Sequence, residues 1–145
     1  IGEHHLKDIE KLFQNTIRYS KWVEIWKESA FRENSPHVLI IDNIGMLSRL
    51  YHYATIAYVG GGFGGDGLHN ILEAAVYGRP VIHGPHYERF PEAIELIEAG
   101  GSFWVENALE LEDTLQKLLA NSSEYGKAAT AAEEFVTMRE PVKTA

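Results

Sequence analysis

The glycine-rich stretch from residue 60 to residue 67 is the segment most able to do chemistry. It carries six of the chain's 13 glycines and leads directly to His69 and Asn70. Glycine has no side chain, so a backbone built from it can approach a ligand closely. A helix predicted to follow would add unpaired N–H groups and a partial positive charge at its start, which suit a phosphate. The stretch is therefore predicted to bind an anionic group such as the phosphate of a nucleotide.

The same segment also has explanations that need no phosphate. Asn70 and Glu73 match a capping box, in which Asn70 caps the helix and Glu73 reaches back to its amide. The glycines also satisfy the G-x-G-x-x-G pattern of dinucleotide-binding loops, starting at Gly60 and again at Gly62. That pattern should follow the first strand of its domain, but at least two predicted strands precede it here. From the residues alone these interpretations stay open.

Other polar residues stand near the ends of predicted strands. His83 is expected to form a hydrogen bond within its loop. Arg18 and Arg89 could each reach a phosphate or a carboxylate, although a solvated arginine is the simpler expectation. Asp66 would place a negative charge near the proposed anion. Because His83 and His86 have no third ligand nearby, the sequence predicts no metal site.

Alternating strands and helices must position these residues. Short apolar runs, typical of buried parallel strands, alternate with helical stretches, which predicts an α/β fold with a Rossmann-like parallel sheet and helices on both faces. Ligands in such folds bind beyond the carboxyl ends of the strands. Gly78 is expected to end one helix in a left-handed conformation. The predicted strands are 16–19, 38–41, 56–59, 81–83 and 102–105; the predicted helices are one ending before residue 14, then 21–32, 46–53, 68–77, 91–99, 108–120 and 122–139.

The composition excludes several classes of protein. The chain has 145 residues, with 13 lysines and arginines against 21 aspartates and glutamates, so its formal net charge is −8. This negative charge opposes binding to nucleic acid and to anionic lipid. The chain has no cysteine, which excludes disulfides, thiolate metal sites and cysteine nucleophiles. No apolar run approaches the roughly 20 residues that span a bilayer, so a cytoplasmic protein is expected.

Four segments carry a resemblance to a known family. They are Ile41–Leu47, Tyr58–Gly62, His69–Ala75 and Pro80–His86. In order and spacing they resemble the C-terminal half of the 3-deoxy-D-manno-octulosonic acid (Kdo) transferases, two-domain GT-B glycosyltransferases of lipopolysaccharide biosynthesis. The resemblance implies that residues 1–145 form a CMP-Kdo-binding domain that is truncated at its N-terminus. No cofactor besides the donor substrate is implied.

The resemblance also places the missing functions. The lipid A precursor that accepts Kdo would bind an N-terminal half absent from this sequence, at the cytoplasmic face of the bacterial inner membrane. That half would also supply the catalytic base. No catalytic residue is therefore expected in this chain, and the fragment alone is expected to be inactive.

Within the chain, the resemblance assigns the phosphate and the ribose to the segment around the glycine loop. The backbone of Gly61 and Gly62 and the helix start at His69 and Asn70 would hold the phosphate. Glu73 would accept hydrogen bonds from the ribose hydroxyls, because a carboxylate is a strong acceptor for a vicinal diol.

The nucleobase and the sugar are assigned to two other loops. Gly45 and Met46 would lie beside the nucleobase, where the thioether offers a polarisable wall. Gly84, Pro85 and His86 would border the sugar. The family usually has an acidic residue at the position of Met46 and commonly a glycine at the position of Leu68.

Two other classes of function stay open at this point. A UDP-sugar 2-epimerase-like domain would share the architecture, the glycine loop and a ribose-binding glutamate. A nicotinamide-binding or other nucleotide-binding module would use the glycine loop without transferring a sugar. The three hypotheses differ in the nucleotide that binds best, which is CMP for the transferase, UDP for the epimerase and NAD for the nicotinamide module.

Overall fold

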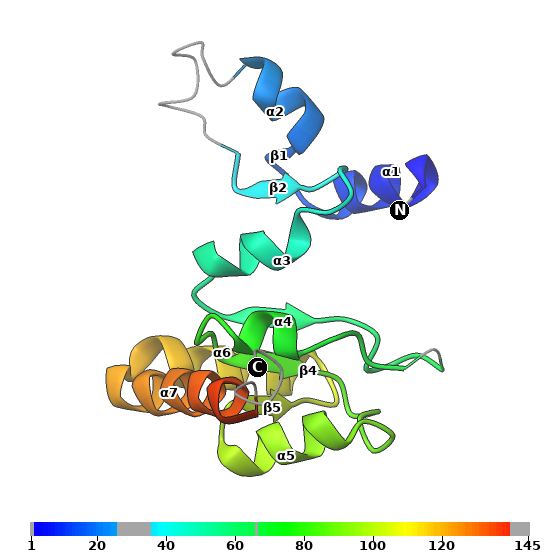
Figure 1. Ribbon diagram of the computed structural model, residues 1–145. Coiled ribbons are helices and arrows are strands. Elements are labelled where there is room, and N and C mark those ends of the chain that lie inside the picture. The colour runs from blue at the N-terminus through cyan, green and yellow to red at the C-terminus, as the bar shows by residue number, and fades with distance from the viewer. Residues whose placement is uncertain (1, 26–35, 66, 140–145) are drawn as a thin grey trace. The chain divides into compact units, whose positions relative to one another are not determined.

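The computed structural model describes residues 2–25, 36–65 and 67–139, and Figure 1 shows the chain as a ribbon. The chain divides into two compact units, Ile1–Met46 and Leu47–Ala145. Each unit combines helices with parallel strands, and the two are described in turn.

The first unit is built on a pair of parallel strands. Thr16 lies opposite Val38 and Arg18 lies opposite Ile40 in this pair. The predicted helix over 21–32 begins earlier, at Tyr19, and its part beyond residue 25 lies outside the described residues. The elements are α1 (Glu3–Leu12), β1 (Thr16–Arg18), α2 (Tyr19–Ile25) and β2 (Val38–Ile40).

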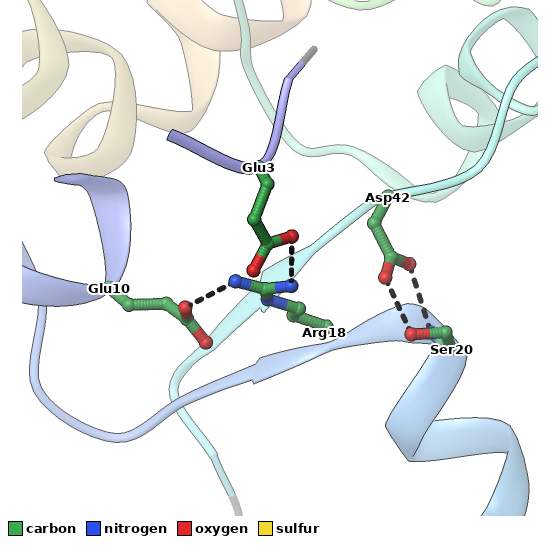
Figure 2. Close-up of polar contacts among 5 residues, drawn as sticks. All are labelled: Glu3, Glu10, Arg18, Ser20 and Asp42. Atoms are coloured by element: carbon green, nitrogen blue, oxygen red, sulfur yellow. Dashed lines mark hydrogen bonds and ion pairs between the residues drawn. The ribbon is translucent and has the colours of Figure 1, made fainter. Parts of the chain in front are cut away.

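Arg18 joins α1 to the end of β1 (Figure 2). Its guanidinium donates to Glu3 Oε2 at 2.9 Å and to Glu10 Oε1 at 2.8 Å. Glu3 and Glu10 are seven residues apart, so they share one face of α1. Its hydrogen bonds to these carboxylates, the one to Glu3 first, raise the pKa of Arg18 above its ordinary value. Arg18, which the sequence predicts to be solvated, is thus paired with two carboxylates, and its contact with a phosphate stays a prediction.

The second unit contains a three-stranded parallel sheet in the order β3-β4-β5. Alternate residues of β4 face opposite sides of this sheet. Val81 packs in a cluster with Ala75 and Leu96, whereas Ile82 packs in a second cluster with Leu118. The predicted helices on both faces are thus confirmed. The elements are α3 (Leu47–Leu50), the 3₁₀ helix η2 (Tyr51–Tyr53), β3 (Ala57–Val59), α4 (Leu72–Ala75), β4 (Val81–His83), α5 (Pro91–Ala99), β5 (Ser102–Trp104), α6 (Ala108–Ala120) and α7 (Ser122–Arg139).

The last three helices of the second unit have the bounds expected from the sequence, and α6 and α7 pack side by side (Figure 1). Local signals explain this agreement. Pro91 begins α5, and Gly100 ends it in a left-handed conformation. Asn107 caps α6, where its side chain accepts from the Glu110 N–H at 2.9 Å. Among the described residues no helix is long and apolar enough to cross a membrane.

Candidate nucleotide-binding site

The glycine-rich loop between β3 and α4 folds back on itself. Gly61 has a φ of +89°, and a Cβ there would lie 2.2 Å from the carbonyl oxygen of Gly67. The N–H of His69 donates to the carbonyl of Gly60 at 3.0 Å, which closes the loop. A side chain at Gly61 would open this closure, so the loop requires glycine at that position.

Two further glycines bring this loop against the loop that follows β4. A Cβ on Gly62 would lie 2.6 Å from the backbone nitrogen of Gly84, and a Cβ on Gly84 would lie 2.6 Å from the carbonyl oxygen of Gly62. The His86 N–H donates to the Gly62 carbonyl at 2.8 Å, and His86 Nδ1 lies 3.4 Å from the Gly64 carbonyl oxygen. The carboxyl ends of β3 and β4 therefore carry one continuous backbone surface.

The helix after the glycine loop is shorter than the sequence predicts. A helix over 68–77 is expected, but α4 covers only Leu72–Ala75. Leu68 and Ile71 are 7% and 4% exposed, and their burial in the core holds the approach to α4 in an irregular conformation. A four-residue helix aligns few peptide dipoles, so the positive charge expected at its start is small. Gly78 has the expected left-handed conformation, with a φ of +69°, but α4 ends at Ala75, so Gly78 is not its cap.

The capping box is only half formed. The side-chain oxygen of Asn70 accepts from the Leu72 N–H at 2.9 Å. Within residues 67–139 Glu73 forms no hydrogen bond back to the Asn70 amide, so its carboxylate stays available. Its charge adds to burial, the larger cause, in raising the pKa of Tyr51.

Cavities flank this surface on the second unit. One of about 360 Å³ is lined by residues 68–72 and by Phe90 and Glu92. Another of about 470 Å³ shares Asn70 with the first and adds Glu73. A smaller one of about 190 Å³ lies between the glycine loop and the loop of His86. The predicted site residues of this unit are thus gathered at cavities or in the backbone surface beside them.

Exposure separates the predicted residues of the second unit into two groups. Gly62 and Gly84 are buried against each other, so packing is their first role. The other residues present atoms to solvent. His69, Asn70 and His86 are exposed, and Gly61, Glu73 and Pro85 are half-buried.

Gly45 and Met46 belong to the first unit, in the loop after β2. Gly45 has a φ of +91°, and no atom lies within 4 Å of the place where its Cβ would be. Asn43 Nδ2 lies 3.2 Å from Met46 Sδ. The loop therefore has a defined shape and open space beside its glycine.

Sequence comparison finds several Kdo transferases among the relatives of this chain. Over 100 residues the chain is 38% identical to the 3-deoxy-D-manno-octulosonic acid transferase of Aquifex aeolicus (strain VF5), which covers 68% of the chain and 28% of that protein. The transferase of Bordetella pertussis is 37% identical over 116 residues, covering 74% of the chain and 27% of that protein. The chain thus spans little more than a quarter of these relatives' length. No protein-family model matches it.

A solved structure shares the fold. The chain superposes on the crystal structure of the C-terminal CMP-Kdo binding domain of WaaA from Acinetobacter baumannii with a TM-score of 0.75, covering 92% of this chain and 67% of that one. The chain is a relative of the Kdo transferases. At 24% identity the structural match establishes the fold, and the α/β class with parallel strands expected from the sequence is confirmed.

One departure from the Kdo transferase pattern has a structural explanation. Leu68 stands where the family commonly has a glycine, and its side chain is 7% exposed within the core of the second unit. The neighbouring Gly67 lies against the ring of Phe90, which would be 2.8 Å from a Cβ at that position. Leu68 therefore serves the packing of the loop. Asp66 lies outside the described residues.

His83 is buried behind the surface of this Kdo transferase relative. Its Nδ1 lies 2.9 Å from the Gly84 carbonyl oxygen, which confirms the predicted loop hydrogen bond. A carbonyl only accepts, so the neutral ring carries its proton on Nδ1. Burial lowers the pKa of His83 below its ordinary value of 6.5. The ring packs edge-on to Tyr87 at 5.7 Å, and within the described residues Nε2 has no hydrogen-bond partner.

Sequence reasoning missed two residues of the first unit. Asp42 accepts hydrogen bonds from the backbone N–H and from the side chain of Ser20. These bonds, the side-chain bond first, lower the pKa of Asp42. Asp42 lies in the first motif shared with the Kdo transferases and directly after a predicted strand, a position that could have indicated a role.

Proposed function

We propose that this chain is the donor-binding domain of a glycosyltransferase that moves Kdo from CMP-Kdo to a lipid A precursor. The observation that carries the proposal is the 38% and 37% identity to Kdo transferases in a chain whose paired loops lie at the carboxyl ends of parallel strands. Ligands of open α/β sheets bind at that edge. The lipid acceptor, the membrane contact and the catalytic base would belong to the remainder of the transferase.

Hydrogen bonding selects which groups would hold the phosphate. The His69 N–H already donates to Gly60, so His69 would contact the phosphate through its exposed ring. Within residues 67–139 and 36–65, the N–H groups of Gly61 and Asn70 donate to no protein atom, and they would be the backbone donors. Gly62 would act by letting the two loops meet.

The ribose, the sugar and the nucleobase of CMP-Kdo would each contact other residues of the chain. Glu73, whose carboxylate forms no hydrogen bond in the described chain, would accept from the ribose hydroxyls. Pro85 and His86 would border the sugar, and Gly84 would keep their loop against the glycine loop. In the first unit Met46 would contact the nucleobase. No cofactor beyond the donor is proposed.

The chemistry follows from where charge develops. When the bond between Kdo and the phosphate oxygen breaks, its electron pair goes to the leaving CMP. N–H groups already aimed at that oxygen stabilise the transition state more than the ground state. Removing one such donor typically raises a barrier by ~3–4 kcal/mol. The chain would therefore supply binding and leaving-group stabilisation, and it would show negligible turnover alone.

Calorimetry with three nucleotides tests the proposal. The wild-type chain is expected to bind CMP more tightly than UDP or NAD. Preference for UDP would instead favour an epimerase-like domain, and preference for NAD a nicotinamide-binding module. Failure to bind any of the three would overturn the donor-binding role.

The Glu73→Ala variant tests the ribose contact. Hydrogen bonds to a charged group contribute about 1.5–3 kcal/mol, so CMP affinity should fall roughly tenfold to hundredfold. Glu98→Ala removes the same charge from an exposed position of α5 and is the matched control. Equal CMP affinity in Glu73→Ala and Glu98→Ala would remove Glu73 from the site.

A further inference from the structure

A cavity of about 190 Å³ lies between the glycine loop and the loop that follows β4, wholly within the second unit. Glycines line it on one side, and His86, Glu88 and Arg89 line it on the other. Pockets for drug-sized ligands begin at about 300 Å³, so a cavity of this size would hold one part of a nucleotide sugar and not the whole of it.

Two charged side chains of this cavity have no partner in the part of the chain that the structure describes. Neither the carboxylate of Glu88 nor the guanidinium of Arg89 forms a hydrogen bond or an ion pair there, and both residues are exposed. Arg139, which lines the cavity of about 470 Å³, differs because its guanidinium pairs with Glu92 and Glu95. The five N–H donors of Arg89 therefore stay available to a ligand.

A cation and a carboxylate in one small cavity fit a sugar that carries an acid group. A guanidinium matches a carboxylate through two parallel N–H···O bonds. The carboxylate of Glu88 can accept from sugar hydroxyls, but it repels an anion. A phosphate alone would meet the attraction of Arg89 together with the repulsion of Glu88. A hydroxylated sugar acid can satisfy each of the two side chains separately.

The covalent structure of the proposed donor places its acid group beside the phosphate. In CMP-Kdo the anomeric carbon of the sugar carries both the carboxylate and the oxygen that leads to phosphorus. The cavity of about 360 Å³, which His69 and Asn70 line, shares Phe90 with the smaller cavity. A donor whose phosphate is held at Asn70 would therefore have the cavity of Arg89 next to its carboxylate.

We propose that the 190 Å³ cavity binds the acidic sugar of the donor, with Arg89 on its carboxylate and Glu88 on its hydroxyls. His86, which borders the sugar in the proposed function, lines the same cavity. The inference rests on that function, because it takes CMP-Kdo as the ligand. It makes Arg89 the residue that distinguishes an acidic sugar from a neutral one, since a neutral sugar would leave the guanidinium without its partner.

Calorimetry with CMP and with freshly prepared CMP-Kdo tests the role of Arg89. In the wild-type 145-residue chain CMP-Kdo should bind more tightly than CMP, because the sugar adds contacts. Arg89→Ala should lower CMP-Kdo affinity about tenfold or more and leave CMP affinity within about twofold of wild type. Arg89→Lys keeps the charge without the two parallel bonds, so its loss should be smaller. Lys117→Ala removes an equal charge from an exposed position of α6 and should match wild type.

Two variants of Glu88 test the contact with the sugar hydroxyls. Glu88→Ala should lower CMP-Kdo affinity about tenfold, and Glu88→Gln should lower it less, because the amide oxygen still accepts. Glu98→Ala, at an exposed position of α5, is the matched control. Thermal unfolding of each variant shows that affinity is measured on folded protein. Should Arg89→Ala fail to fold, Arg89→Gln removes the charge with less change in shape.

The outcomes are distinct. Equal losses of CMP and CMP-Kdo affinity in Arg89→Ala would place Arg89 on the phosphate, and unchanged affinity for both would leave it in solvent; either result overturns its role. Higher CMP-Kdo affinity in Glu88→Ala would show repulsion of the donor and overturn the hydroxyl contact. Equal wild-type affinities for CMP and CMP-Kdo would reject the sugar cavity and leave nucleotide binding intact. Absence of binding to both would reject the proposed function and this cavity together.

Discussion

The two units hold their loops by different means. In the first unit, side chains make the connections, with Asp42 on Ser20 and Arg18 between two glutamates. In the second unit, the backbones of Gly62 and Gly84 meet directly, with no room for a side chain. Ionic and hydrogen-bonded contacts respond to salt, to pH and to conservative substitution. A backbone contact responds mainly to volume, so the two units should differ in what disrupts them.

The largest effect is expected from a larger side chain at the backbone contact between Gly62 and Gly84. Gly62→Val would place side-chain atoms into the Gly84 backbone, and overpacking of this kind typically destabilises by about 1–3 kcal/mol. Urea-induced unfolding measures the change. Gly64→Val is the matched control, because no atom lies within 4 Å of a Cβ there. Equal unfolding midpoints for the two variants would show that the loops do not meet as described.

A second prediction concerns the buried imidazole beneath the backbone surface. Because the folded pKa of His83 is lowered, the unfolded chain takes up the proton first as pH falls. The contribution of His83 is therefore complete above its ordinary pKa of 6.5 and is lost as pH drops below that value toward the folded pKa.

Urea unfolding at two pH values tests whether stability falls as pH drops. The free energy of unfolding of the wild-type chain should be lower at about pH 5.5 than at about pH 7.5, since the ordinary histidine pKa lies between them. His83→Gln should reduce that difference, whereas His5→Gln, on an exposed position of α1, should not. A difference that His83→Gln leaves intact would place the pH sensitivity elsewhere.

The smallest effect should come from the ionic contacts of the first unit. Arg18→Ala removes both ion pairs and should lower the urea midpoint by less than Gly62→Val does, because such pairs are screened by solvent. The loss should shrink between ~0.05 M and ~0.5 M salt, where the screening length shortens. Lys21→Ala, which breaks an exposed pair of 3.9 Å, is the control and should have no measurable effect. A salt-independent loss in Arg18→Ala would mean that packing, not charge, joins α1 to β1.

The regions that sequence predicted well are those with local signals. The bounds of α5 follow from Pro91 and Gly100, and the start of α6 follows from Asn107. Each of these residues lies at the end of the helix that it delimits. The motif around His69 and Glu73 indicated the Kdo transferase relatives that the comparisons then found. The roles assigned to individual site residues stay predictions until a nucleotide is bound.

The sequence by itself determined the α/β class, the order of strands and helices and the family resemblance, because apolar periodicity and turn residues act over a few positions. Only the tertiary structure decided that α4 is short, that Gly62 meets Gly84 and that Arg18 and Asp42 are held by distant partners. Those contacts join residues up to 22 positions apart, as Ser20 and Asp42 are. Which segments meet at such separations depends on how strands pair and cores pack, and no local pattern encodes it.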